Sequence, residues 1–505
     1  MSTGITKSIG SVSGATLLSR ILGYLRDMVV ASRFGNGWAA DTFYLAFRIP
    51  NLLRDLLGEG SLSSGFIPVF SECLVKKGKD EAISLYSACI GILLFILSGV
   101  TLLGMIFAPA IVRIIAWGWV DKPEQIALAV TLTRIMFPFI AFISLSALAM
   151  GVLNSLQVFF IPAVAPMMVS IFEIAAVVWL VPLMKVPVEG LAWGVLLGGL
   201  FQFLWQIPAL VKKGFLSRII FRLTPEIKKI GVLIIPVAIG SGVRQLNVLV
   251  DQVCASFLPD GSIMALYYAN RLYQLPLALF GISIATVALP AMSLSAAQQD
   301  LGQLKQTFSS SIRMTIFTLV PSMIGLIVLG QPIIKLLFEH GSFNNQGTAM
   351  TAFALAFYSL GLVFFAGAKI GASAFYALQD TKTPVKIAIA AMVLNAFLNI
   401  ILMQFLQVGG LALATSIAAA FNMAVLVYLL RQRIGVLGGR QIWNSMRKVL
   451  LAAAVMGMVC YYARHWIIIA LIMGVVVYIG MAYVLKIEEL KYIKKIIWKK
   501  QDLHD

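Results

Sequence analysis

The sequence predicts an all-α polytopic membrane protein, because three features of the chain agree. Apolar residues make up 60% of the 505 residues and charged residues 12%, whereas soluble domains have about 45–50% and about 25%. The mean hydropathy is +0.93, which leaves too little polar surface to cover a soluble body. Apolar runs of about 20 residues, each long enough to cross a bilayer as a helix, recur along the whole length.

These runs predict fourteen transmembrane helices. They lie near residues 10–33, 38–72, 82–107, 126–153, 158–183, 188–211, 227–258, 262–292, 307–338, 347–376, 384–406, 409–431, 445–463 and 466–486. Pro50, Gly58 and Gly60 predict a break within the second crossing, since proline and glycine interrupt helices.

Basic residues in the short loops predict the orientation. Lysines and arginines follow crossings two, six, ten and twelve and recur in the tail, at Lys76, Lys77, Lys79, Lys212, Lys213, Arg218, Arg222, Lys382, Lys386, Arg431, Arg433, Arg440, Lys491, Lys494 and Lys495. If the crossings alternate, all of these lie on one side, so both termini are predicted to be cytoplasmic. The same placement accounts for the net charge of +18 without nucleic acid as a partner.

The chain carries an internal repeat. Five matches occur in order, each pair separated by 220–224 residues: Asp27 with Asp251, Arg48 with Arg271, Pro68 with Pro290, Leu156-Gln157 with Leu378-Gln379, and Val188 with Val408. Six crossings per repeat make the copies parallel, and parallel repeats are related by an axis along the membrane normal. We therefore predict a lobe over 1–222, a second over 223–433, a cleft between them, and two additional helices with a basic tail over 434–505.

Ionisable residues inside the first, second, seventh and eighth crossings mark the predicted site. A charge at the centre of a bilayer costs about 2.5–3.5 kcal/mol, so it must face a cavity or a partner. The five arginines at comparable depth outnumber the three acids there: Arg20, Arg26, Arg48, Arg54 and Arg271 against Asp27, Asp41 and Asp251. Surplus guanidinium groups favour a phosphate-bearing ligand, which they bind in bidentate fashion. The alternative is mutual pairing, in which Asp27 neutralises Arg26 or Arg20.

Other residue types exclude several functions. The four cysteines and three histidines show no disulfide or metal-ligand spacing, so neither a cofactor nor a metal is expected. A membrane-embedded glycosyl- or acyltransferase would need a carboxylate cluster or a reactive histidine. A cation-drug antiporter would need unpaired acids in the cleft, and a structural scaffold would leave the buried arginines unexplained. A transporter is therefore expected rather than an enzyme.

Two long motifs carry a family resemblance. The stretches LLSRILGYLRDMVVASRFG and ADTFYLAFRIPNLLRDLLGEGSLSSGFIPVFSE, with YYANRLYQLP and LQDTKTPVKIAI later on, resemble the MurJ (MviN) lipid II flippases of the multidrug/oligosaccharidyl-lipid/polysaccharide exporter superfamily. The resemblance covers essentially the whole chain. It departs at Asn270, where many members have aspartate before the arginine.

The resemblance implies a V-shaped pair of six-helix lobes and a function. The family moves lipid II, the undecaprenyl-pyrophosphate-linked peptidoglycan precursor, from the inner to the outer leaflet of the bacterial cytoplasmic (inner) membrane. Its essential arginines correspond to Arg20, Arg26, Arg54 and Arg271, and Asp41 and Glu59 also fall on its pattern. Membrane lipids and other cell-wall synthesis proteins are further expected partners. The alternatives are a flippase for another polyprenyl-linked oligosaccharide and a cation-drug antiporter of the same superfamily.

A coupling ion is a separate expectation. Asn395 and Asn399 share one helix face, and Thr415 and Asp251 are further oxygen donors in neighbouring predicted helices. Together they predict a site for a small hard cation such as Na⁺, which some family members carry in this lobe. Alternatively, the two asparagines bond across helices as packing contacts. Coupling would then come from the membrane potential or a proton gradient.

Overall fold

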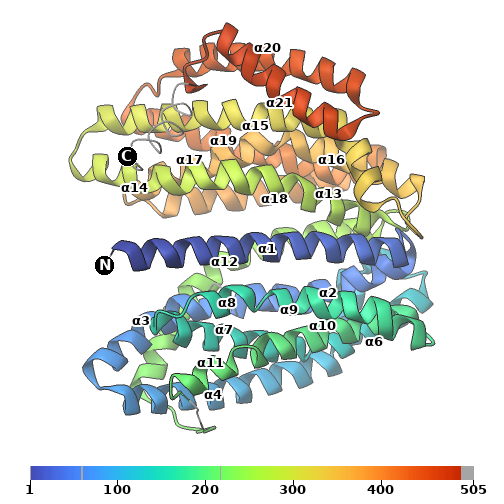
Figure 1. The fold of residues 1–505 in the computed structure, drawn as a ribbon, viewed down its shortest axis with the longest axis vertical. Helices are drawn as coiled ribbons and strands as arrows, with labels where there is room; N and C mark the ends of the chain where they lie inside the picture. Colours follow the sequence, from blue (N-terminus) through green and yellow to red (C-terminus); the bar gives the residue numbers. More distant parts are fainter. Residues whose placement is uncertain (1, 58–60, 216–217, 491–505) are drawn as a thin grey trace. The chain divides into compact units, whose positions relative to one another are not determined.

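The computed structural model describes residues 2–57, 61–215 and 218–490, and its regular secondary structure in these ranges is helical, with no strand among them (Figure 1). Eleven of its helical stretches are long and apolar enough to cross a membrane. They coincide with the third to sixth and eighth to fourteenth predicted crossings. The other three predicted crossings fall on α1, on α2 with α3, and on α12.

The chain divides into two compact units. Unit 1 holds Met1–Ile263 and His340–Phe343, and unit 2 holds Met264–Glu339 and the rest of the chain. The helices of unit 1 are α1 (Ser2–Phe34), α2 (Trp38–Leu57), α3 (Ser61–Lys76), α4 (Lys79–Ile106), α5 (Ala108–Ile115), α6 (Pro123–Met136), α7 (Phe139–Ser155), α8 (Phe160–Val164), α9 (Met167–Ala175), α10 (Pro187–Leu204), α11 (Ile207–Lys212) and α12 (Pro225–Ser256).

The remaining helices belong to unit 2, apart from the first residues of α13. They are α13 (Ser262–Pro276), α14 (Ser283–Ala297), α15 (Leu301–Phe338), α16 (Asn345–Leu360), α17 (Leu362–Ala377), α18 (Lys382–Leu406), α19 (Val408–Ile434), α20 (Gly439–Ala463) and α21 (Ile467–Val484). A π-helical turn over Leu277–Ile282 joins α13 to α14.

The second predicted crossing is divided, though not at its proline. Pro50 lies inside α2, which continues to Leu57, and α3 begins at Ser61. The predicted break at Pro50 is therefore wrong. Gly58 and Gly60 lie outside the described residues.

The unit boundary follows α12 instead of residue 222. α12 packs on α3 and α2 of unit 1, and Ile230 shares an apolar core with Phe66 and Phe70 of α3. The predicted repeat boundary and the boundary of the compact units thus differ by one helix. The two are separate properties, because a repeat is defined by sequence and a compact unit by packing.

The last two helices pack on α15 within unit 2 (Figure 1). Glycine allows the close approach: a Cβ on Gly457 of α20 would lie 2.7 Å from Ile324 of α15, and one on Gly474 of α21 would lie 2.8 Å from the Cys460 sulfur. Small residues at such crossings are typical of membrane helices. The Tyr478 hydroxyl donates to the Phe317 carbonyl at 2.6 Å and fixes α21 in place.

One residue pair matched in the predicted repeat has the same turn in both units. Gln157 and Gln379 have φ angles of 60° and 59°, a left-handed conformation that ends helices α7 and α17. The residue after each glutamine donates from its backbone N–H to a carbonyl five residues earlier, at 2.9 Å in both turns. This is the Schellman arrangement of a helix end.

Candidate functional site

A buried charged cluster lies between α1 and α9 in unit 1. The Arg26 guanidinium donates to Asp27 Oδ1 at 3.0 Å from Nε and 2.7 Å from Nη2, and to Glu173 Oε1 at 3.2 Å from Nη1. Asp27 is 0% exposed and Glu173 4% exposed. An isolated buried ion loses several kcal/mol of hydration, so the three groups stabilise one another.

The cluster combines a predicted pair with a residue that sequence reasoning missed. Pairing of Asp27 with Arg26 is one of the two alternatives for the buried charges, and the structure has it. Glu173 is not among the predicted site residues. A signal for it exists, since Glu173 is the single ionisable residue of the apolar run 158–183, and lone acids in such runs are rarely without a role.

Asp41 has a structural partner in this conformation. It is 3% exposed, and its Oδ2 accepts from the backbone N–H of Gly261 at 2.6 Å. Gly261 has a φ of +90°, and a Cβ there would lie 2.3 Å from the Asn36 carbonyl oxygen. Asp41 therefore fastens the start of α2 to the turn between α12 and α13.

The other predicted site arginines differ in exposure. Arg48 and Arg54 are half-buried on α2, whereas Arg20 is exposed on α1. Arg271 is half-buried on α13 and belongs to unit 2. Glu59 lies outside the described residues. Among these guanidinium groups of unit 1, Arg26 is half-buried and paired with two buried acids, Arg48 and Arg54 are half-buried, and Arg20 is exposed.

The proposed cation ligands form a hydrogen-bonded chain across α18 and α19. Asn399 Nδ2 donates to Asn395 Oδ1 at 3.1 Å, and Asn395 Nδ2 donates to Thr415 Oγ1 at 3.3 Å. The Thr415 hydroxyl in turn donates to the Leu411 carbonyl at 2.8 Å. Asp251 lies on α12 of unit 1, so it belongs to a different compact unit from the other three. These hydrogen bonds between side chains of adjacent helices agree with the alternative in which the two asparagines are packing contacts.

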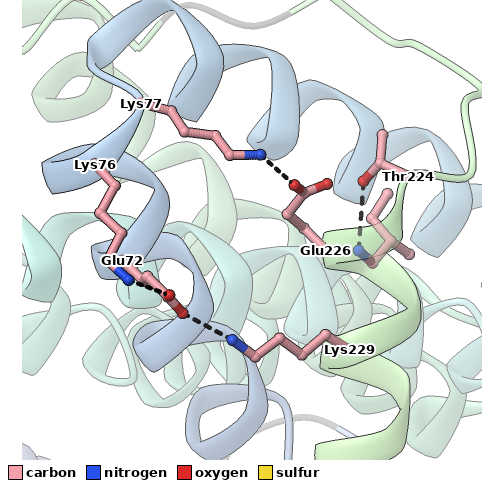
Figure 2. Close-up of polar contacts among 7 residues, drawn as sticks. Glu72, Lys76, Lys77, Thr224, Glu226 and Lys229 are labelled. Carbon is pink, nitrogen blue, oxygen red and sulfur yellow. Dashed lines mark hydrogen bonds and ion pairs between the residues drawn. The ribbon is translucent and has the colours of Figure 1, made fainter.

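Ion pairs join α3 to the start of α12 (Figure 2). Glu72 accepts from Lys76 at 2.9 Å and from Lys229 at 2.7 Å, and Glu226 accepts from Lys77 at 2.6 Å. The hydrogen bond from Lys77 is the main reason why the pKa of Glu226 falls from 4.5 to about 2. Thr224 caps α12 by accepting from the Ile227 N–H at 3.4 Å. The predicted loop lysines are therefore also structural contacts within unit 1.

Comparisons with known proteins agree with this architecture. The family model for the lipid II flippase MurJ matches residues 30–481. A probable lipid II flippase MurJ of Vibrio cholerae is 39% identical over 90% of this chain and 89% of its own. The lipid II flippase MurJ of Burkholderia cenocepacia is 37% identical over 85% of this chain and 84% of its own.

Solved structures give the same result. A lipid II flippase MurJ in an inward closed conformation has a TM-score of 0.79 and 30% identity, covering 94% of this chain and 98% of that one. An inward-facing multidrug resistance MATE transporter has a TM-score of 0.69 at 17% identity, covering 83% and 95%, and shares the fold alone. The sequence resemblance is confirmed, and this chain belongs to the MurJ family of lipid II flippases.

Proposed function

We propose that this protein is a flippase that moves lipid II from the inner to the outer leaflet of a bacterial cytoplasmic membrane. Family membership over residues 30–481 is the observation that carries the proposal. The guanidinium groups on α1, α2 and α13 support it, because a pyrophosphate offers the oxygens that such groups bind in pairs. No covalent step is needed, in keeping with a family of transporters.

The proposed mechanism is alternating access. Fourteen crossings, two parallel six-helix lobes around a V-shaped cleft and cytoplasmic termini would let the head group enter from the inside and leave outside. The polyprenyl tail would remain in lipid along α20 and α21. Arg20, Arg48, Arg54 and Arg271 would bind the pyrophosphate, with Asp41 and Glu59 bordering the site.

Arg26 would exchange partners in this cycle. Its guanidinium lies 3.2 Å from Glu173 and 2.7 Å from Asp27, so phosphate oxygens would compete with carboxylates for the same N–H groups. This competition would lower the affinity of the site for lipid II and so help the release of lipid II after transfer. A ligand shifts the equilibrium between the inward- and outward-facing states only by the difference in its affinity for them.

Leaflet translocation of labelled lipid II in proteoliposomes tests the proposal. Wild-type protein should move the label across, and vesicles containing the same protein with Arg20, Arg54 and Arg271 changed to Ala should not. Transport of a cationic drug with no movement of lipid II would instead assign the antiporter function. Transport of another polyprenyl-linked oligosaccharide in preference to lipid II would assign that substrate.

A further inference from the structure

A polar cavity of about 610 Å³ lies at one end of three unit 2 helices. It is bordered by the start of α15, the start of α20, and the residues that follow α21. Its lining includes Lys305, Ser309, Arg313, Ser445, Lys448 and Glu489. None of these residues belongs to the proposed substrate site.

The cavity has the features of an anion site. Gly438, the N-cap of α20, lines it, and no acidic residue occupies the first turn of that helix to offset its dipole. Unpaired N–H groups at a helix start attract anions. A Cβ on Gly438 would lie 2.9 Å from Ser309 Oγ, so the helix start lies directly beside that hydroxyl.

Two buried hydroxyls at the cavity supply a second observation. Ser309 is 3% exposed and Ser445 is 7% exposed, and neither Oγ has a hydrogen-bond partner among the described residues. Buried hydroxyls are nearly always paired. A ligand with several acceptor oxygens would satisfy both.

One arginine lies close to both acids at the cavity, although Glu489 Oε1 accepts no hydrogen bond from any described residue. Arg313 Nη1 lies 2.8 Å from Glu488 Oε2 and 3.2 Å from Glu489 Oε1. Lys305 and Lys448 form no ion pair with any residue that the structure describes. Among the described residues, Lys448 donates to the Lys486 carbonyl alone, at 3.4 Å. Two ammonium groups are therefore available to an anion.

A separate apolar pocket of about 460 Å³ also borders the start of α20, at Gly439, Arg440 and Ile442. Phe308, Ile312, Met423 and Val427 line it, together with Arg431 and Arg440. α21 carries no charged residue from Ile467 to Val484, and Lys486 and Glu488 follow it at once, so this end of the helices lies at headgroup level. Basic pockets between membrane helices at this level suit anionic lipids.

We propose that the cavity binds the phosphate group of an anionic lipid, with Lys305, Lys448, the two serine hydroxyls and the start of α20 around the phosphate, and an acyl chain in the apolar pocket. The site goes beyond the proposed flippase function, since it needs no lipid II. It would make the packing of α20 and α21 on α15 depend on the charge of the surrounding lipid.

The test uses full-length protein in bilayers of phosphatidylcholine, with and without phosphatidylglycerol. Native mass spectrometry should show phosphatidylglycerol retained by the wild type. The K305Q/K448Q variant should lose this retention by roughly tenfold or more, the effect of one lost charge-assisted hydrogen bond. S445A, which removes only a hydroxyl, should lose less but measurably.

The matched control is K382Q/K386Q, which removes the same charge from two exposed lysines at the start of α18 in the same unit. It should bind phosphatidylglycerol as the wild type does, and equal loss in both double variants would overturn the proposal. Displacement of phosphatidylglycerol by inorganic phosphate would support recognition of the lipid through its phosphate group. Binding of inorganic phosphate without retention of phosphatidylglycerol would overturn the proposal that the bound phosphate group belongs to a lipid.

Discussion

Arg26 Nη1 lies 3.2 Å from Glu173 Oε1, an ion pair between helices α1 and α9 of unit 1. Asp27 contacts the same guanidinium through its Oδ1 at 2.7 Å, so two carboxylates share one arginine. Glu173 is the one of the two that comes from a different helix. This makes it the most informative position at which to alter the cluster.

Substitution of Glu173 by Gln should strengthen the binding of lipid II. The amide keeps the shape and an acceptor oxygen but no longer competes electrostatically for Arg26, so we expect a roughly three- to tenfold lower apparent Kd and slower turnover. Binding titration and the translocation assay measure the two effects. E124Q, which neutralises an exposed acid in the first turn of α6, should change neither, and unchanged affinity in E173Q would exclude the partner exchange.

Arg20 and Arg26 should respond differently to Ala. R20A removes an exposed guanidinium, so expression and thermal stability should stay normal while translocation is lost. R26A removes the guanidinium that contacts both buried carboxylates, and the loss of one member of a buried ion pair costs about 3–5 kcal/mol. R26A should therefore express poorly, and R26A/E173Q should recover part of the stability, because Asp27 still lacks the guanidinium, but not translocation.

Stability of the detergent-solubilised variants, followed by the midpoint of thermal unfolding, checks this pattern. R26K should recover part of the translocation, since lysine keeps the charge without the planar fork. Normal stability of R26A, or full activity of R20A, would contradict the roles given to these two residues.

Local features of the sequence predicted most of the helices, but contacts between residues far apart in the sequence could not be predicted from it. Apolar runs fix where a helix can cross, so eleven predicted crossings coincide with the helical stretches found. The partner of Arg26 is 147 residues away, and no local pattern identifies it. Asp41 likewise accepts from a backbone N–H 220 residues away, so its structural contact could not be read from its position in α2. The assignment of α12 to unit 1 depends on packing against α3, which hydropathy does not encode.

The Lys77–Glu226 ion pair should show a defined pH dependence. The folded-state pKa of Glu226 is lowered from 4.5 to about 2, so its stabilising contribution is present above pH 4.5 and disappears as the pH falls towards 2. The difference in unfolding midpoint between wild type and E226Q should be constant from about pH 8 to about pH 5 and shrink below that.

The expected difference is small, because exposed ion pairs contribute about 0–1 kcal/mol. High salt should reduce it further. D121N, which removes an exposed acid in a loop, is the control for the loss of one negative charge and should leave the unfolding midpoint at neutral pH unchanged. A difference that grows on acidification would contradict a lowered pKa of Glu226 in the folded state.

Loop charge predicts which residues face the cytoplasm. Single cysteines at Lys77, Arg218 and Lys382 should react with a membrane-impermeant thiol reagent only after the cells are opened. Cysteines at Asn36 and Asn344 should react in intact cells. Before the labelling, Cys73, Cys89, Cys254 and Cys460, which are all buried, are changed to Ser. Labelling of positions 218 and 382 from opposite sides would refute both the topology and the parallel repeat.

Separate variants of Asn399 and Asp251 test whether flipping is coupled to sodium. If a cation is bound through Asn395 Oδ1, Asn399 Oδ1 and Thr415 Oγ1, N399A should abolish any dependence of flipping on a sodium gradient, and D251N should weaken it. If the amides are only packing contacts, N399A should lower the unfolding midpoint while leaving the response to sodium unchanged, because losing a buried hydrogen bond costs about 1–3 kcal/mol. N422A, on α19 of the same unit, controls for loss of an amide elsewhere. A wild type that is indifferent to sodium would leave the membrane potential or a proton gradient as the driving force, with the Asn399–Asn395–Thr415 chain holding α18 to α19.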